Sequence, residues 1–202
     1  MSTYKVGEQM LSLSVIAEII AEERQLVLGE KAKQKIQECR DYLDKKMEQS
    51  DAPIYGINTG FGALCNHKIS KKDLGKLQRN LVLSHACGTG DKVPDEIVKT
   101  MLLLKAQSLS YGHSGVQLET VERLIEMFNN NILPVVYQQG SLGASGDLAP
   151  LAHLSLPLLG EGEVYFEGKK KKSKSKKKIR TKIFSRNFRK KNHNFPPISI
   201  NE

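Results

Sequence analysis

The 202-residue sequence predicts a mainly α-helical protein, with short extended segments and glycine-rich loops between its helices. Apolar residues recur at helical spacing along several segments, as they do in helices that bury one face. Proline and acidic residues stand where some of these segments begin, which is where helices favour them. Glycine clusters at 56–62 and 140–146 separate the segments and are typical of loops.

The N-terminal quarter is expected to hold two helices. The apolar residues between Leu13 and Ile20 fall at helical spacing, and a short extended segment, QLVLG, follows them. Residues 30–48 are rich in strong helix formers, so a long helix is expected there. Residues 51–64, DAPIYGINTGFGAL, combine a proline with several glycines and are expected to form a loop or a strand.

Four more helices are expected further along the chain. They are predicted over 73–84, 95–109, 116–129 and 148–159. Ser70 and Asp73 have the spacing of a capping box in which Asp replaces the usual Glu. Pro94 precedes two acids at the start of the second of these helices, and Asp147 is placed to cap the last one.

The net charge of +9 is concentrated in the C-terminal tail. Residues 1–168 carry 17 basic against 21 acidic side chains, whereas residues 169–202 carry 14 against 1. The mildly acidic body argues against a nucleic-acid-binding surface. The tail could attract nucleic acid or a membrane surface without specificity, but we interpret it as the product of a reading-frame slip in a lysine codon run. Residues 1–168 are therefore expected to be the structured portion.

Several common sites are not expected. The three cysteines form no CxxC pair, so neither a disulfide framework nor a zinc or other metal site is predicted. GINTGFG lacks the spacing of a dinucleotide-binding loop, and no GxSxG nucleophile motif occurs. The N-terminus does not resemble a secretory signal, and no apolar run approaches the roughly 20 residues of a membrane helix. A cytoplasmic protein is expected.

The stretch GSLGASGD at 140–147 offers unusual backbone chemistry. Because Gly146 has no side chain, its amide nitrogen can approach the Ala144 carbonyl carbon. Ring closure there, with loss of one water from the ring and another from the Ser145 hydroxyl, would create an electrophilic methylidene group. A helix beginning at Asp147 would place its positive end beside that ring. The alternative is an ordinary flexible loop.

Three motifs resemble those of the aromatic amino-acid ammonia-lyases. GSLGASGDLAPLAHLSLPLLGEGEV at 140–164 resembles the family signature. YGINTGFGAL at 55–64 is similar to the loop that carries the catalytic tyrosine, and NLVLSHACGTG at 80–90 resembles a segment that helps select the substrate ring. The resemblance runs from about residue 10 to 168 and implies the N-terminal portion of the ammonia-lyase/fumarase-like helical fold.

The resemblance implies roles for particular residues. Ala144, Ser145 and Gly146 would mature without an external cofactor into 4-methylidene-imidazol-5-one, with Ser145 supplying the methylidene carbon. Tyr55 matches the tyrosine that takes the β-proton, although it could also be an ordinary aromatic at a strand edge. Covalent help of this kind is needed because a β-hydrogen is weakly acidic and an amine is a poor leaving group.

The pair Ser84-His85 matches family members that act on histidine. A polar pair suits an imidazole ring, which carries hydrogen-bonding nitrogens. The resemblance therefore implies a carbon–nitrogen lyase that converts L-histidine to trans-urocanate, with His85 contacting the substrate. A tyrosine 2,3-aminomutase or tyrosine ammonia-lyase is the alternative within the family, and His85 could also merely cap its helix.

The family's chains are more than twice as long and assemble as homotetramers whose active sites draw on three subunits. Their later active-site residues have no counterpart here, so this chain is expected to be inactive as it stands. The alternative from another class is a non-catalytic fragment with a basic binding tail.

Overall fold

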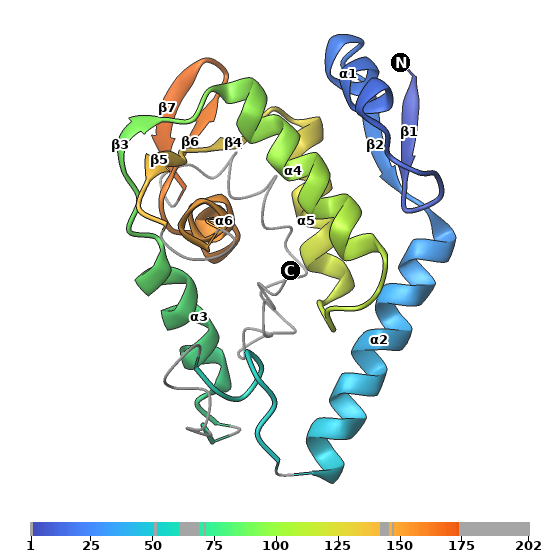
Figure 1. Cartoon of the computed structure of the whole chain (residues 1–202), viewed down its shortest axis with the longest axis vertical. Coiled ribbons are helices and arrows are strands. Elements are labelled where there is room, and N and C mark those ends of the chain that lie inside the picture. Colours follow the sequence, from blue (N-terminus) through green and yellow to red (C-terminus); the bar gives the residue numbers. More distant parts are fainter. Residues whose placement is uncertain are drawn as a thin grey trace.

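The computed structural model is mainly α-helical, as the sequence predicts (Figure 1). It describes residues 2–50, 52–60, 69–70, 72–141, 146 and 148–173. Its helices are α1 (Leu13–Ala21), α2 (Glu30–Gln49), α3 (Leu74–His85), α4 (Asp95–Ser110), α5 (Leu118–Asn129), α6 (Leu148–Ser155) and the 3-10 helix η2 (Leu156–Leu159). Its strands are β1 (Thr3–Val6), β2 (Gln25–Leu28), β3 (Thr89–Lys92), β4 (Leu133–Pro134), β5 (Tyr137–Gln139), β6 (Glu163–Phe166) and β7 (Lys169–Lys172).

The strands form three small sheets at the margins of the helices. β1 and β2 pair in parallel, β3 pairs antiparallel with β5, and β4, β6 and β7 form an antiparallel sheet with β6 in the middle. Within the described ranges, no helix combines the length and the apolar character needed to cross a membrane.

The main core lies around α4 and α5, which pack side by side (Figure 1). The apolar stripe expected on α5 is buried here: Val121 is fully buried and Phe128 is 2% exposed. Leu102 and Leu103 of α4 are fully buried as well. Because α2 and β2 also contact this pair, the N-terminal elements share one core with the helices that lead to the candidate site.

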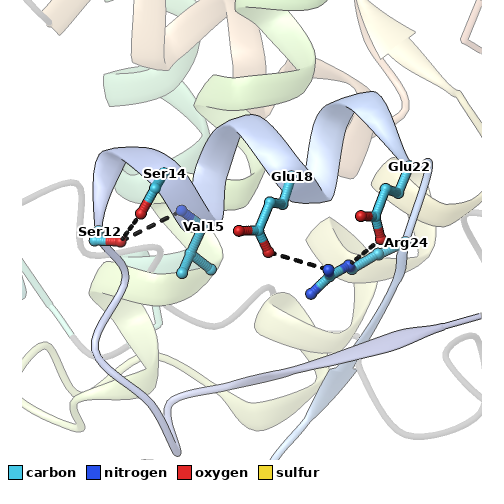
Figure 2. A network of polar contacts seen from close by, with 6 residues as sticks. All are labelled: Ser12, Ser14, Val15, Glu18, Glu22 and Arg24. Carbon is cyan, nitrogen blue, oxygen red and sulfur yellow. Dashed lines mark hydrogen bonds and ion pairs between the residues drawn. The ribbon is translucent and has the colours of Figure 1, made fainter.

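The N-terminal β1–α1–β2 unit has polar contacts at both ends of its helix (Figure 2). Ser12 caps α1, because its Oγ accepts a hydrogen bond of 3.3 Å from the Val15 amide. Beyond the other end, Arg24 donates to Glu18 at 3.1 Å and to Glu22 at 2.8 Å. These contacts fix the turn through which the chain returns to form β2 beside β1.

Helix α4 starts as the sequence predicts, whereas α3 starts differently. Pro94 directly precedes α4, and Asp95 and Glu96 lie in its first turn, as expected. The capping box is not formed as expected: Asp73 is itself the N-cap residue of α3. Ser70 Oγ donates to the Asp73 carboxylate at 2.7 Å, so the two side chains bind each other rather than the helix backbone. Asp147 lies outside the described residues.

The first four lysines after residue 168 form strand β7. Phe166 pairs with Lys169 across a two-residue turn, and both turn residues have positive φ, 54° at Glu167 and 68° at Gly168. Such left-handed pairs match the twist of a hairpin. Lys171 lies with its ammonium 4.7 Å from the Phe166 ring centroid. The ordered hairpin therefore includes residues on both sides of the compositional boundary at 168.

Candidate active site

The loop that carries Tyr55 is built around two buried polar side chains. Asn58 accepts a hydrogen bond from the Ile54 amide at 2.7 Å and donates to the Ala52 carbonyl at 3.1 Å. Thr59 Oγ1 accepts from the Gly56 amide at 3.3 Å. Asn58 and Thr59 are 2% and 0% exposed, whereas Tyr55 is 52% exposed. The turn therefore hides its polar residues and presents Tyr55 outward.

Helix α3 holds this loop. The buried Gln78 side chain donates to the carbonyls of Gly56 at 2.9 Å and Ile57 at 2.8 Å. His85 ends the same helix, about 10 Å further along its axis at ~1.5 Å per residue. One rigid helix thus carries the anchor of the Tyr55 loop and the residue expected to contact the substrate ring.

Tyr55 faces a cavity of about 430 Å³. Tyr42 and Lys46 from α2, and Tyr111 and His113 after α4, line the same cavity. Among the described residues, neither His85 nor Gly146 lines it. Helix α3 therefore connects the Tyr55 loop to His85, while His85 is not among the described residues that line the Tyr55 cavity.

His85 is partly buried at the end of α3. Its Nδ1 lies 2.6 Å from the Leu81 carbonyl oxygen, to which Ser84 Oγ also donates at 3.1 Å. Since a carbonyl can only accept, Nδ1 carries a proton, and Nε2 is the acceptor in the neutral ring. His85 therefore caps the C-terminal end of its own helix. The same contact fixes which ring nitrogen donates and which accepts.

The flanks of the Ala144–Gly146 triad are held closely. Ser141 Oγ accepts a hydrogen bond of 3.1 Å from the Ala149 amide in the first turn of α6, which closes the base of the loop. Gly146 has a φ of 66°, and a Cβ built there would meet nothing within 4 Å. Glycine is thus favoured by the backbone conformation rather than by crowding. Ala144 and Ser145 themselves lie outside the described residues.

The end of α3 and the flank of the triad lie against each other. β3, which follows α3, pairs with β5, which leads to Gly140. A Cβ at Gly140 would lie 2.8 Å from Gly88 Cα and 3.1 Å from the Cys87 carbonyl oxygen. The structure thereby brings the segment just after His85 beside the chain that enters the triad.

Two residues at this junction were not singled out by the sequence as site residues. His153 of α6 is 7% exposed, and its Nε2 accepts a hydrogen bond of 2.9 Å from the Gly88 amide. Burial lowers the pKa of His153. The sequence does contain an indication of this role, because the histidine lies inside the apolar run LAPLAHLSL. A polar side chain buried in such a run requires a hydrogen-bond partner. Gly88, its partner, lies 65 positions away.

The chain is similar to known lyases over most of its length. The sequence model of the family described as aromatic amino acid lyase matches residues 11–181. A histidine ammonia-lyase of Legionella pneumophila (strain Corby) is 52% identical over 158 residues, which are 78% of this chain and 31% of that protein. The chain thus spans about a third of the length of such curated relatives.

Solved structures of lyases and aminomutases also resemble this chain. The crystal structure of histidine ammonia-lyase from Trypanosoma cruzi matches with a TM-score of 0.75 and 32% identity, over 87% of this chain and 33% of that one. A tyrosine aminomutase from Streptomyces globisporus matches with a TM-score of 0.75 and 29% identity, over 85% and 32%. From the match of its sequence and the order of its motifs, the chain belongs to the aromatic amino acid lyase family.

Proposed function

We propose that this chain is the N-terminal portion of a histidine ammonia-lyase, which eliminates ammonia from L-histidine to give trans-urocanate. The observation that supports the proposal is that the Ser84-His85 pair ends α3 three residues before Gly88, which packs against Gly140 on the flank of the triad. His85 Nδ1 faces the Leu81 carbonyl, so Nε2 is the acceptor of the neutral ring. An acceptor there suits the N–H group of a substrate imidazole. The 52% identity to a histidine ammonia-lyase supports the same substrate.

The triad is proposed to mature into 4-methylidene-imidazol-5-one. That group supplies an electrophilic carbon, which assists the departure of ammonia. The residues around it fit this role: Gly146 has the left-handed φ of a tight turn, and Ser141 ties the start of the loop to α6. α6 begins at Leu148, two residues after Gly146, and the positive end of its helix dipole favours negative charge nearby.

Tyr55 is proposed as the group that takes the β-proton of the substrate. Its support is the match of its loop to the family motif and the anchoring of that loop on α3 by Gln78. In the full-length protein we propose a homotetramer, because the family's active sites combine residues of several subunits. This chain would supply the electrophile, His85 and Tyr55. The other two thirds of the relatives' length would supply further substrate contacts.

The second candidate is a tyrosine 2,3-aminomutase, favoured by the structural match to a tyrosine aminomutase from Streptomyces globisporus and by the Ser84-His85 pair. A tyrosine ammonia-lyase is the third. The products distinguish them: urocanate with ammonia, a β-amino acid without ammonia, or coumarate with ammonia.

The deciding experiment follows the ultraviolet absorbance of urocanate with L-histidine, and the products from L-tyrosine in parallel. It compares this chain with a version whose reading frame continues as a lyase after the lysine run. We expect urocanate from the continued version and little from the present chain, because substrate groups that are not held in register react slowly. Faster conversion of L-tyrosine than of L-histidine by the continued version would overturn the proposal.

The tail is proposed to result from the reading-frame slip. Sequencing the gene through codons 165–180 tests this, since another frame should then encode a lyase continuation. An open frame without such a continuation contradicts the slip and favours the basic tail as a binding segment.

A further inference from the structure

We propose that His153 is a positioning residue, which holds the segment after His85 at a fixed place against Gly140, on the chain that leads to the triad, by accepting the Gly88 hydrogen bond. The proposal rests on the proposed function, because it assigns His153 a part in placing His85. It concerns a residue of α6 that is expected to touch neither the substrate nor the prosthetic group.

The first support is where the Gly88 amide finds its partner. α3 ends at His85, and the next capping bond runs from the Ala86 amide to the Val82 carbonyl. Gly88 follows before β3 begins, and its amide donates to His153 Nε2 at 2.9 Å. Gly88 is partly buried, and an amide removed from water without an acceptor is costly, so this bond favours the observed course of the chain between helix and strand.

The second support is how closely Gly88 packs against His153, Gln139 and Gly140. A Cβ at Gly88 would lie 2.9 Å from His153 Nε2 and 3.2 Å from the Gln139 carbonyl oxygen. Gly140 approaches Gly88 so closely that its own Cβ would lie 2.8 Å from the Gly88 Cα. His153, Gly88 and Gly140 therefore form three contacting layers: the helix after the triad, the segment after His85 and the chain before the triad.

The third support is the state and orientation of the His153 ring. Because Nε2 accepts, the neutral ring carries its proton on Nδ1. The Tyr137 ring packs edge-on against it, with the centroids 5.3 Å apart at 71°. Burial lowers the pKa of His153 and so maintains the neutral form that accepts. In an imidazolium, Nε2 would also carry a proton, so that two donors would face each other at Gly88.

These contacts give His153 a defined effect on the site. Gly88 is three residues after His85 and touches Gly140, which is four residues before Ala144. A displacement of Gly88 therefore changes the position of His85 relative to the triad. Small displacements of substrate-contacting groups cost reaction rate without unfolding the protein.

The test compares three variants of the 202-residue chain. His153→Gln keeps an acceptor near the position of Nε2, and His153→Leu keeps similar volume without an acceptor. Gln37→Leu is the control at an exposed polar residue of α2 that does not line the Tyr55 cavity. Nuclear magnetic resonance measures amide exchange at Gly88 and the ring signals of His85 and His153. Circular dichroism measures the fold of each variant.

We expect His153→Leu to speed Gly88 exchange roughly tenfold and to shift the His85 signals. His153→Gln should remain within about threefold of the unaltered chain. The unaltered His153 should show a proton on Nδ1. Unchanged Gly88 exchange in a folded His153→Leu chain, or a proton on His153 Nε2, overturns the proposal. If the Leu variant does not fold, the ring tautomer and the Gln variant decide.

A second measurement determines kcat/KM for L-histidine in any form of the protein that releases urocanate. There, His153→Leu should lower kcat/KM for L-histidine roughly tenfold with the triad fully matured by mass, and His153→Gln should restore it. Unaltered kcat/KM in the Leu variant contradicts the positioning role. If no preparation releases urocanate, the proposed function fails, while the resonance measurements still decide whether His153 holds Gly88.

Discussion

The side chain of Asn129 binds both backbone groups of Leu26. Its Oδ1 accepts from the Leu26 amide at 2.8 Å, and its Nδ2 donates to the Leu26 carbonyl at 2.9 Å. Asn129 ends α5, and Leu26 lies in β2, which pairs with β1. The amide therefore continues the hydrogen bonding of the two-stranded sheet and joins it to the core helices.

Asn129→Ala is expected to lower the free energy of unfolding by about 1–3 kcal/mol, because it leaves a donor and an acceptor of Leu26 without partners. Urea denaturation measures the change. Gln37→Ala is the control, since Gln37 makes an exposed bond to Asp41 on α2 and its loss should cost less than about 0.5 kcal/mol. Equal losses for the two variants would contradict the assigned role of Asn129.

Gln78→Leu is expected to release the Tyr55 loop while leaving the core folded. The substitution removes both bonds to Gly56 and Ile57, so deuterium uptake in a peptide covering 52–60 should rise several-fold. Gln107→Leu is the matched control, because Gln107 is also 4% exposed but binds the Gly7 amide. Uptake that stays the same in 52–60 would show that other contacts hold the loop.

The sequence predicts the helices with strong local signals. α4 begins after Pro94, as expected, and α2 and α5 match their predicted ranges within about two residues. The strands were harder to predict because their partners are distant: β4 pairs with β6, and β7 consists entirely of lysines, which composition alone assigns to a solvated tail. Its pairing depends on the Glu167-Gly168 turn and on β6.

The candidate site was predictable as motifs but not as geometry. The sequence identifies Tyr55, His85 and the triad, yet it does not indicate that Tyr55 faces a cavity beside α2 and α4. Nor does it reveal the Gly88–His153 bond. Both features depend on how distant segments pack, and a motif contains only the local residues.

The pKa of His153 predicts a pH dependence of stability. Burial lowers this pKa below 6.5, so the unfolded chain takes up a proton at a higher pH than the folded chain. The stabilisation is therefore complete above pH 6.5 and is lost as the pH falls below it toward the folded-state value. Urea denaturation at several pH values measures the effect as the difference between the unaltered chain and His153→Gln. A difference that does not vary with pH below 6.5 would contradict it.

Maturation of the triad predicts a change in mass. A preparation with a mature group should be lighter by two waters, localised by digestion to the peptide containing Ala144–Gly146. Ser145→Ala should abolish this loss because the methylidene carbon has no source. Gly146→Ala should reduce it, since φ of 66° strains any residue with a Cβ by roughly 1 kcal/mol and the Cβ obstructs ring closure. An unmodified triad in an active preparation would refute the prosthetic group.

The identity of the substrate predicts the behaviour of His85→Leu. Leu has no acceptor, so the imidazole N–H of L-histidine would be left without a partner in the site. In a preparation that releases urocanate, kcat/KM for L-histidine should fall roughly 10²-fold, while the mass loss at the triad stays complete. Gln37→Leu is the control, because Gln37 is an exposed polar residue of α2 that binds Asp41 and does not line the Tyr55 cavity. Undiminished turnover of L-histidine by His85→Leu would reduce His85 to a cap of α3, and would remove the observation on which the proposed substrate depends.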